Sequence, residues 1–122
     1  MTDRDKIILQ KIVDYASDAL EYVAGSEFDS FMTDKKTVSA CAFVIGQIGE
    51  LASNVSEETR KTYCDVPWRS ICGMRNQIVH DYDHVDMTVL WGTITKSLPE
   101  LIQQLDNVLA QEEEPEQGIQ ML

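Results

Sequence analysis

Residues 38–52 read VSACAFVIGQIGELA, a run that is apolar on nearly every side of a helical wheel. Such a helix is normally enclosed by other helices and does not lie on a surface. We therefore expect a helix over 34–53, with Thr33 as its N-cap, to form the centre of the core. Gly46 and Gly49 each cost this helix about 1 kcal/mol relative to alanine, which predicts the close approach of a neighbouring backbone.

Helical periodicity continues over most of the remaining chain. Thr2 followed by Asp5 resembles a capping box, and Ser56 and Asp86 are good N-cap residues ahead of later apolar repeats. Pro67 suits the first position of a further helix. The helices predicted on these grounds cover 3–24, 34–53, 56–63, 67–80 and 86–109.

Four of these helices are long and their connections are short, which favours antiparallel neighbours. We predict an all-α fold, an antiparallel up-down four-helix bundle with a short extra helix. Pro99 lies inside the last helix, so a kink is expected near 97–99. No segment shows the period-two alternation that is typical of strands. Residues 1–110 are predicted to form a single domain, and residues 111–122 an acidic, mobile tail.

Composition excludes several classes of protein. A chain of 122 residues with 43% hydrophobic and 25% charged residues is ordinary for one globular domain. No apolar run is long enough for a signal peptide or a membrane span, so we expect a cytoplasmic protein that does not bind membranes. Cys41, Cys64 and Cys72 lack C-x-x-C spacing, which predicts reduced filler residues and neither disulfides nor a zinc site.

The formal net charge of -11 argues against a sequence-independent coat for nucleic acid, which would normally be strongly basic. A local basic site is still compatible with this charge. Arg60, Lys61, Arg69 and Arg75 fall close together in the sequence, while Glu112, Glu113, Glu114 and Glu116 lie together in the tail. Acidic and basic residues are therefore partly segregated along the chain.

Residues 74–82 read MRNQIVHDY and carry the groups best suited to chemistry. The Arg75 guanidinium matches two phosphate oxygens, and His80 can take a proton from one hydroxyl and return one to another. These groups fit transesterification of RNA, in which the ribose 2′-hydroxyl attacks the phosphate and no metal or cofactor is needed. Asn76 could position the phosphate or hold the imidazole.

Arg75 and His80 are five positions apart, which on an ideal helix separates them by about 140°. They would not share one face. Either the helix is loosened at His80, or a second copy of the chain completes the site across a two-fold axis. We expect a homodimer together with some loosening.

Other interpretations of the same residues remain open. Arg75 could pair with a carboxylate while His80 interacts with the end of the helix, a purely structural arrangement. Residues 80–84, HDYDH, together with Asp86, could instead bind a metal, although no Glu follows the first His as in zincins. Glu50 lies within the apolar central helix, where it is either buried beside Arg75 or Arg69 or exposed on a narrow polar stripe.

The pattern Arg75-Asn76-x-x-x-His80-x-Tyr82, preceded by Pro67-Trp68 and by Ile48-Gly49-Glu50, resembles the HepT-like toxins of the HEPN superfamily. The likeness covers roughly residues 3–108. It implies an all-helical homodimer whose Arg and His line a cleft at the two-fold interface. It also implies a metal-independent endoribonuclease toxin that cuts RNA such as tRNA or mRNA, with Arg75, His80 and Asn76 as the catalytic residues.

The same resemblance implies a partner. In such pairs a minimal nucleotidyltransferase antitoxin transfers AMP from ATP to the tyrosine two residues after the histidine, which is Tyr82 in this chain. Glu50, Arg69 and Asp81 are the residues that we expect to support the site. A different class of function is a noncatalytic helical module that only forms a complex with the nucleotidyltransferase.

Overall fold

The structure, a computed structural model, describes the backbone of residues 1–81 and 84–120 and the side chains of residues 1–79 and 84–113. Helices account for most of this described chain, so the predicted all-α class is confirmed. In chain order the elements are α1 (Asp3–Val23), α2 (Phe28–Thr33), α3 (Lys35–Ser53), α4 (Glu57–Thr62), α5 (Trp68–Cys72), α6 (Met74–Ile78), β1 (Val79–Asp81), β2 (His84–Val85), α7 (Met87–Gly92), the π-helical turn η1 (Thr93–Ser97) and α8 (Leu98–Gln120).

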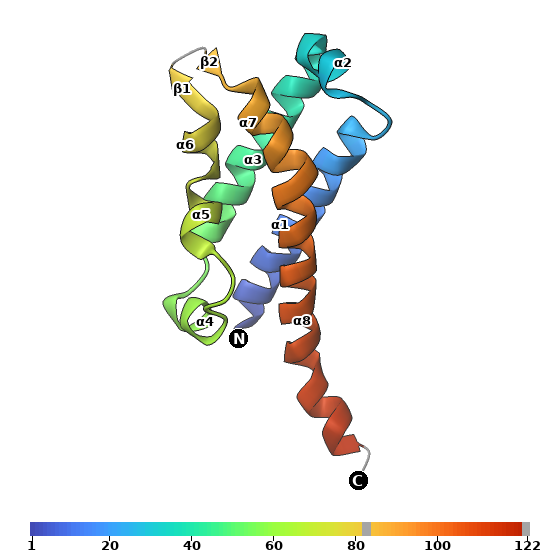
Figure 1. The fold of residues 1–122 in the computed structure, drawn as a ribbon. Helices are drawn as coiled ribbons and strands as arrows, with labels where there is room; N and C mark the ends of the chain where they lie inside the picture. Colours follow the sequence, from blue (N-terminus) through green and yellow to red (C-terminus); the bar gives the residue numbers. More distant parts are fainter. Residues whose placement is uncertain (82–83, 121–122) are drawn as a thin grey trace.

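Three long helices, α1, α3 and α8, make up the body of the fold (Figure 1). α1 packs against α3 and α8, and the short helices α5 and α6 lie against α3. α4 lies at the same end as the N-terminus, and β1 and β2 lie at the opposite end. The core contains large aliphatic side chains that are less than 2% exposed: Leu9, Ile12, Ile45, Ile48, Ile71, Ile78, Leu90, Ile94, Leu98 and Leu105.

The central helix α3 is buried on one side only, although its apolar sequence predicts a helix enclosed by others. Ile45 and Ile48 are fully buried, but Phe43 is 63% exposed and Glu50 is also exposed. Positions 43 and 50 are two turns apart, so they lie on the same face of the helix. This open face of α3 is the one that borders α6, as the surface hollow described below shows.

Most of the predicted N-caps are confirmed. The Thr2 hydroxyl accepts from the Asp5 N–H at 3.1 Å, and the Asp86 carboxylate accepts from the Val89 N–H at 3.0 Å. The predicted cap at Thr33 is wrong, because Asp34 accepts from the Thr37 N–H at 3.1 Å and caps α3. A carboxylate at this position also interacts favourably with the helix dipole.

Helix α2 is absent from the sequence prediction. Its aromatic residues Phe28 and Phe31 pack against Trp91 of α7, with ring centroids 6.1 Å and 5.0 Å apart. The Ser30 hydroxyl accepts from the Glu27 N–H at 3.2 Å and supports the first turn. Six residues are too few to show a helical period, so this helix depends on a tertiary contact that the local sequence does not report.

The long helix predicted over 67–80 is wrong. Gly73 separates two short helices, α5 and α6, and Pro67 precedes α5 as its N-cap instead of occupying its first turn. The chain leaves the helical conformation at Val79, whose φ of −101° and ψ of 108° are extended. β1 then pairs with β2 in antiparallel orientation, with Val79 opposite Val85, so the expectation of no strands is also wrong.

A π-helical turn lies in the last helical arm, just before the kink predicted near 97–99. The π-helical turn η1 ends at Ser97, and the Leu98 N–H donates to the Thr93 carbonyl five residues earlier. Pro99 has no N–H to continue the regular pattern, and a widened turn before it makes room for the proline ring. The structure thus has a π-helical turn at residues 93–97, directly before Pro99, and a kink near 97–99 stays a prediction.

α8 continues to Gln120, through the segment for which the sequence predicts a mobile tail. Glu112, within that segment, forms contacts with the body of the protein. Division of the chain into a domain over 1–110 and a tail over 111–122 stays a prediction. None of the helices that the structure describes has an apolar stretch of the length needed to cross a bilayer.

The three cysteines are free but differ in their surroundings. Cys41 is fully buried in α3, and burial raises the pKa of its thiol to about 11. Cys72 is partly buried, whereas Cys64 is exposed in the connection between α4 and α5. The expectation that all three are buried fillers is therefore wrong for Cys64.

Candidate functional site

Helix α6 presents Arg75 on the surface. Met74 and Ile78 are buried, and because they are four positions apart they anchor one face of the helix against the core. The other side carries Arg75, Asn76 and Gln77, which are all exposed. α6 thus holds the two residues of the motif that come before its histidine at a fixed place beside α3.

Arg75 borders an open hollow between α3 and α6. The hollow has a volume of about 500 Å³, and it adjoins the exposed Phe43 side chain. Its size suits a nucleotide-sized group, and its one described cation is Arg75. The residues that line it are Ala42, Phe43, Gly46, Gln47, Glu50, Arg75 and Val79.

Arg75 is not neutralised by any side chain that the structure describes. The ion pairs of the described residues join Lys61 to Glu57 and the Met1 amine to Glu112, and neither involves Arg75. The structural interpretation, in which Arg75 pairs with a carboxylate, therefore finds no support among these residues. A guanidinium that is exposed at an open hollow and forms no ion pair with a described residue is suited to an incoming anion.

His80 lies in β1, because the helix ends two residues before it. This confirms the expected loosening of the helix at His80. The Asp86 N–H donates to the Ile78 carbonyl at 2.7 Å. This bond closes the base of the two-stranded ribbon that β1 and β2 form. The side chains of His80 and Asp81, and all of Tyr82, lie outside the described residues. Whether the imidazole faces Arg75 stays a prediction.

Glu50 and Arg69 were predicted to support the site. Glu50 is exposed and lines the same hollow as Arg75, so the interpretation as a solvated residue on a polar stripe is the one that fits. Arg69 is exposed on α5 and is not among the residues that line the hollow. The structure thus brings Glu50 near Arg75 and leaves Arg69 outside the hollow.

The basic cluster expected from the sequence is smaller in the structure. Arg60 donates to the carbonyls of Ala52 and Val55 at 2.8 Å and 3.2 Å, where it caps the end of α3. Lys61 forms an exposed ion pair with Glu57 at 3.2 Å. Of these four cationic residues, Arg69 and Arg75 form neither an ion pair nor a hydrogen bond to a carbonyl among the described residues.

The alternative metal site over 80–84 depends largely on side chains outside the described residues. Within the described part of the chain, no group of three or more His, Cys, Asp or Glu side chains could hold a metal ion. His84, the described histidine of this stretch, is exposed in β2.

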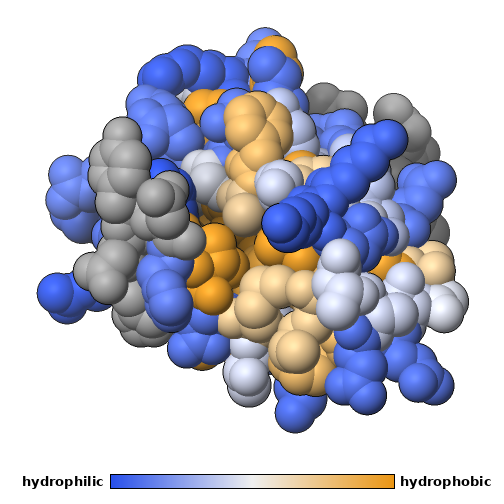
Figure 2. Space-filling view, turned by 90° about the horizontal axis from the view of Figure 1, so that it is seen from above, coloured by the Kyte–Doolittle hydropathy of each residue, from blue (hydrophilic) through white to orange (hydrophobic). Residues whose placement is uncertain are grey.

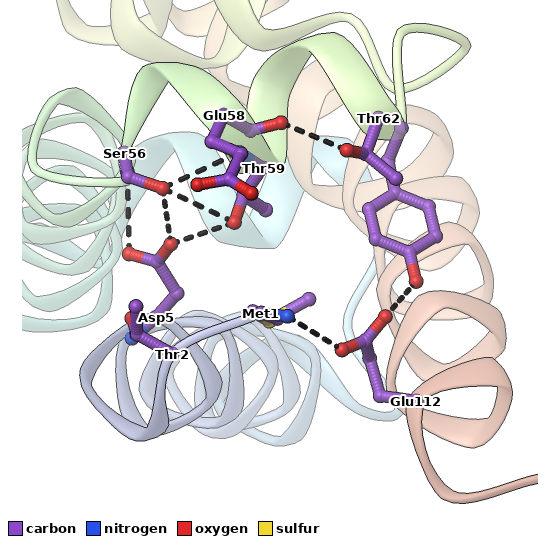
Figure 3. A network of polar contacts seen from close by, with 9 residues as sticks. Met1, Thr2, Asp5, Ser56, Glu58, Thr59, Thr62 and Glu112 are labelled. Carbon is purple, nitrogen blue, oxygen red and sulfur yellow. Dashed lines mark hydrogen bonds and ion pairs between the residues drawn. The ribbon is translucent and has the colours of Figure 1, made fainter. Parts of the chain in front are cut away.

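A second polar cluster lies at the opposite end of the molecule, near α4 (Figures 1 and 3). The buried Asp5 carboxylate accepts from the hydroxyls of Ser56 and Thr59, and the Tyr63 hydroxyl donates to Glu112. This last bond raises the pKa of Tyr63 to about 12 and lowers the pKa of Glu112. A hollow of about 150 Å³ adjoins the cluster.

Sequence reasoning missed this cluster. The available signal was the pairing of Thr2 with Asp5 and of Ser56 with Thr59, each three residues apart at a helix start. In the structure the hydroxyls of Ser56 and Thr59 donate to Asp5, and no buried polar side-chain atom in the described chain lacks a partner. The cluster is therefore satisfied internally and ties elements together, so we do not assign it the chemistry.

Comparison with known proteins distinguishes the Arg75 hollow from the polar cluster near α4. The family described as ribonuclease HepT-like matches residues 12–108. The chain belongs to this family of the HEPN superfamily. The HepT-like match includes α6 and the ribbon, whereas Asp5 and Glu112 of the polar cluster fall outside it. The Arg75 hollow is therefore the candidate site that lies wholly within the HepT-like region.

Relatives of this HepT-like protein carry ribonuclease names. A candidate RNase of Caldanaerobacter subterraneus subsp. tengcongensis is 34% identical over 104 residues, which cover 85% of this chain and 93% of the relative. A probable ribonuclease HepT of Thermococcus cleftensis is 35% identical over 74 residues, covering 61% and 67%. A candidate RNase of Methanocaldococcus jannaschii is 26% identical over 110 residues, covering 89% and 91%. No solved structure gives a significant match. Ribonuclease activity is thus supported at the level of the family.

Proposed function

We propose that this chain is a metal-independent endoribonuclease toxin that a nucleotidyltransferase antitoxin silences by transferring AMP to Tyr82. The observation that carries this proposal is the placement of Arg75. Its guanidinium is exposed at an open hollow, no described carboxylate neutralises it, and the ribbon that contains His80 begins where α6 ends.

The proposed reaction is attack of a ribose 2′-hydroxyl on the adjacent phosphate. His80 accepts the proton of the 2′-hydroxyl or protonates the leaving 5′-oxygen, and the products are a 2′,3′-cyclic phosphate and a free 5′-hydroxyl. Arg75 stabilises the charge that gathers on the phosphoryl oxygens, a contribution worth about 10²- to 10³-fold in rate for one well-placed donor. Asn76, exposed beside Arg75, positions the phosphate or the imidazole.

A homodimer is part of this proposal. Phe43 is 63% exposed beside the hollow, and burial of such a large apolar side chain favours association. A second copy over this face of α3 would bring two Arg75–His80 pairs to one cleft, so that one imidazole acts as base and the other as acid. The apolar surface that lies open at the end bearing β1 and β2, within a largely hydrophilic rim, offers a further contact area for a protein partner (Figure 2).

The net charge of -11 limits how this protein binds RNA. A chain with this charge repels a polyanion, so few phosphate contacts hold the substrate and the binding is weak and sensitive to salt. A structured substrate such as tRNA, presented to a narrow site, suits such a surface better than a long single strand. We therefore propose that the substrate is a structured RNA, either tRNA or a folded region of mRNA.

Transfer of AMP to Tyr82 would act as an off switch. The Tyr82 hydroxyl attacks the α-phosphate of ATP, pyrophosphate leaves, and a phosphodiester anion with its nucleoside remains on the ring. Tyr82 follows His80 by two residues, so this anion would lie near Arg75 and occupy the place of an RNA phosphate. Tyr82→Phe should leave the toxin active when the antitoxin is coexpressed, while the wild type is silenced.

The decisive experiment compares the two histidines of the ribbon. Wild type, His80→Ala and His84→Ala are expressed under induction, growth is scored and RNA ends are mapped. We expect arrest and new RNA ends with wild type and His84→Ala, and neither with His80→Ala. Equal loss in both variants would favour the metal-site interpretation. Arrest by His80→Ala equal to that by wild type would refute the proposed chemistry.

A test in vitro separates an enzyme from a noncatalytic module. The purified chain should cut RNA in EDTA, leave a cyclic phosphate, and spare a substrate with a 2′-deoxy nucleotide at the cleavage position. If the chain forms a complex with the nucleotidyltransferase but cuts no RNA under any of these conditions, the noncatalytic module is the correct function.

A further inference from the structure

Two glycines in α3 lie under the α5–α6 corner that carries Arg75. A Cβ atom at Gly49 would lie 3.1 Å from the Cys72 carbonyl oxygen and 3.5 Å from that of Ile71. A Cβ atom at Gly46 would lie 3.4 Å from Cδ and 3.8 Å from Nε of Arg75. Gly49 therefore lies against the backbone of α5, as the sequence predicts. Gly46 lies against the aliphatic stem of the Arg75 side chain.

We propose that Gly46 is a positioning residue for Arg75, an inference that rests on the proposed function of this site. Because position 46 has no side chain, the aliphatic stem of Arg75 lies directly on the surface of α3. The stem fixes the direction of the guanidinium, which borders the hollow together with Gln47 and Glu50. A larger residue at position 46 would occupy the space of the stem and turn the guanidinium away.

The two glycines act on different parts of one corner. Gly49 lets the C-terminal carbonyls of α5 approach α3, which places Gly73 and the start of α6. Gly46, three residues earlier and so on a neighbouring part of the same face, then receives the side chain that α6 projects. The contrast with Gly92 supports this assignment, because a Cβ atom there would meet nothing within 4 Å.

Positioning matters for Arg75 because the residue is exposed and long. A free arginine side chain samples many rotamers, and only some of them place the planar fork of donors against a phosphate. Contact of Cδ and Nε with α3 removes rotamers before the substrate arrives, so the guanidinium is already oriented for the transition state. A larger residue at position 46 should therefore lower mainly kcat, and KM should change little.

The experiment compares Gly46→Leu with Gly92→Leu, the same replacement at a helical glycine with open space. For Gly46→Leu we expect kcat for RNA cleavage to fall about tenfold or more, because a small misplacement of a catalytic group is costly, with KM within about threefold. For Gly92→Leu we expect kcat within about twofold of wild type. Circular dichroism and thermal melting establish that both variants fold. Gly46→Ala, whose added methyl group reaches Arg75 only at contact distance, serves as a milder variant that should fold in any case.

A second measurement does not depend on cleavage. The Nε–Hε resonance of Arg75, assigned by its loss in Arg75→Lys, should shift in Gly46→Leu and, by a smaller amount, in Gly46→Ala. The Arg60 resonance is the internal reference, since its Nε donates to the Val55 carbonyl away from the hollow. It should not move in either variant.

The inference is overturned if the Arg75 resonance stays in place in both Gly46 variants, or if Gly46→Leu folds and keeps kcat within about twofold of wild type. Failure of the proposed function gives a different result. In that case Arg75→Ala cleaves RNA as well as wild type does, or no preparation cleaves RNA at all, while the resonance shift still reports whether Gly46 positions the side chain.

Discussion

Asp5 and Ser56 are 51 residues apart in sequence and joined by two hydrogen bonds, since the Asp5 carboxylate accepts from both the backbone N–H and the hydroxyl of Ser56. The Thr59 hydroxyl adds a third bond, at 2.6 Å. Asp5 is only 1% exposed. Burial raises its pKa, but the hydrogen bonds from Ser56 and Thr59 outweigh burial and the net shift of the pKa is downward. This carboxylate holds the start of α1 against the start of α4.

Asp5→Asn should therefore destabilise the protein. The amide keeps one acceptor oxygen but replaces the other by a donor, so the hydroxyls of Ser56 and Thr59 lose the charged oxygen that accepts from both of them. We expect the free energy of unfolding to fall by about 1.5–3 kcal/mol, the range for hydrogen bonds to a charged group. Urea unfolding at pH 7 measures the change. Asp3→Asn, an exposed acid in the same first turn, is the control and should change stability by less than about 0.5 kcal/mol.

Stability should also depend on pH through the same carboxylate. The folded pKa of Asp5 is lowered, so its contribution is complete above the unfolded value of about 3.9 and is lost as pH falls through the folded pKa. The pKa of Glu112 is lowered by the Tyr63 hydroxyl and by the Met1 amine, which adds a loss of the same sign. Thermal melting from pH 6 to pH 3 should show a steeper loss for wild type than for Asp5→Asn. Parallel curves for the two proteins would contradict this assignment.

The main helices could be predicted from the sequence because their signals are local. The apolar periods of α1 and α3 and the side-chain caps at Thr2, Ser56 and Asp86 depend only on residues a few positions apart. The helical class follows from the same kind of evidence, whereas the helix predicted to run to residue 80 ends at Ile78. The chemistry of the side chains singled out Arg75 and His80, and the family resemblance added the role of Tyr82 and the nucleotidyltransferase partner.

What the sequence did not predict depends on contacts between distant segments. Strands of three and two residues are too short for a period, and Val79 pairs with Val85 only once the chain has turned back. α2 requires the contact of Phe31 with Trp91, 60 positions later. Phe43 belongs to an apolar run that predicts burial, but a run of letters does not say whether another element of the same chain covers that face.

Gly49→Ala should destabilise the protein, unlike alanine at most helical glycines. The added methyl group would lie 3.1 Å from the Cys72 carbonyl oxygen, and this backbone atom cannot rotate away as a side chain can. We expect a loss of about 1–3 kcal/mol in the free energy of unfolding, as for other overpacked positions. Gly92→Ala is the matched control. With nothing within 4 Å of its Cβ, it should gain up to about 1 kcal/mol from helix propensity.

Phe43→Glu should abolish the proposed homodimer. Its side chain is exposed beside the hollow, and a carboxylate in its place would be brought close to its own copy across a two-fold axis. Sedimentation should report a dimer for wild type and a monomer for Phe43→Glu, with RNA cleavage lost in parallel. Tyr22→Glu replaces another exposed aromatic residue, on α1, and should stay dimeric. A wild-type protein that sediments as a monomer at micromolar concentration while it cleaves RNA would contradict the proposed assembly.

Arg75→Lys tests whether the guanidinium acts through its shape or through its charge alone. Lysine keeps the positive charge but has a single ammonium group, so it cannot bind two phosphate oxygens with parallel hydrogen bonds. If the fork stabilises the transition state, kcat should fall about 10²-fold in Arg75→Lys and further in Arg75→Ala, while the salt dependence of RNA binding stays near that of wild type in Arg75→Lys. Lys61→Ala removes a surface cation that pairs with Glu57 and should leave kcat within about twofold. Full activity in Arg75→Lys, with loss only in Arg75→Ala, would mean that Arg75 attracts RNA by charge and does not orient the phosphate.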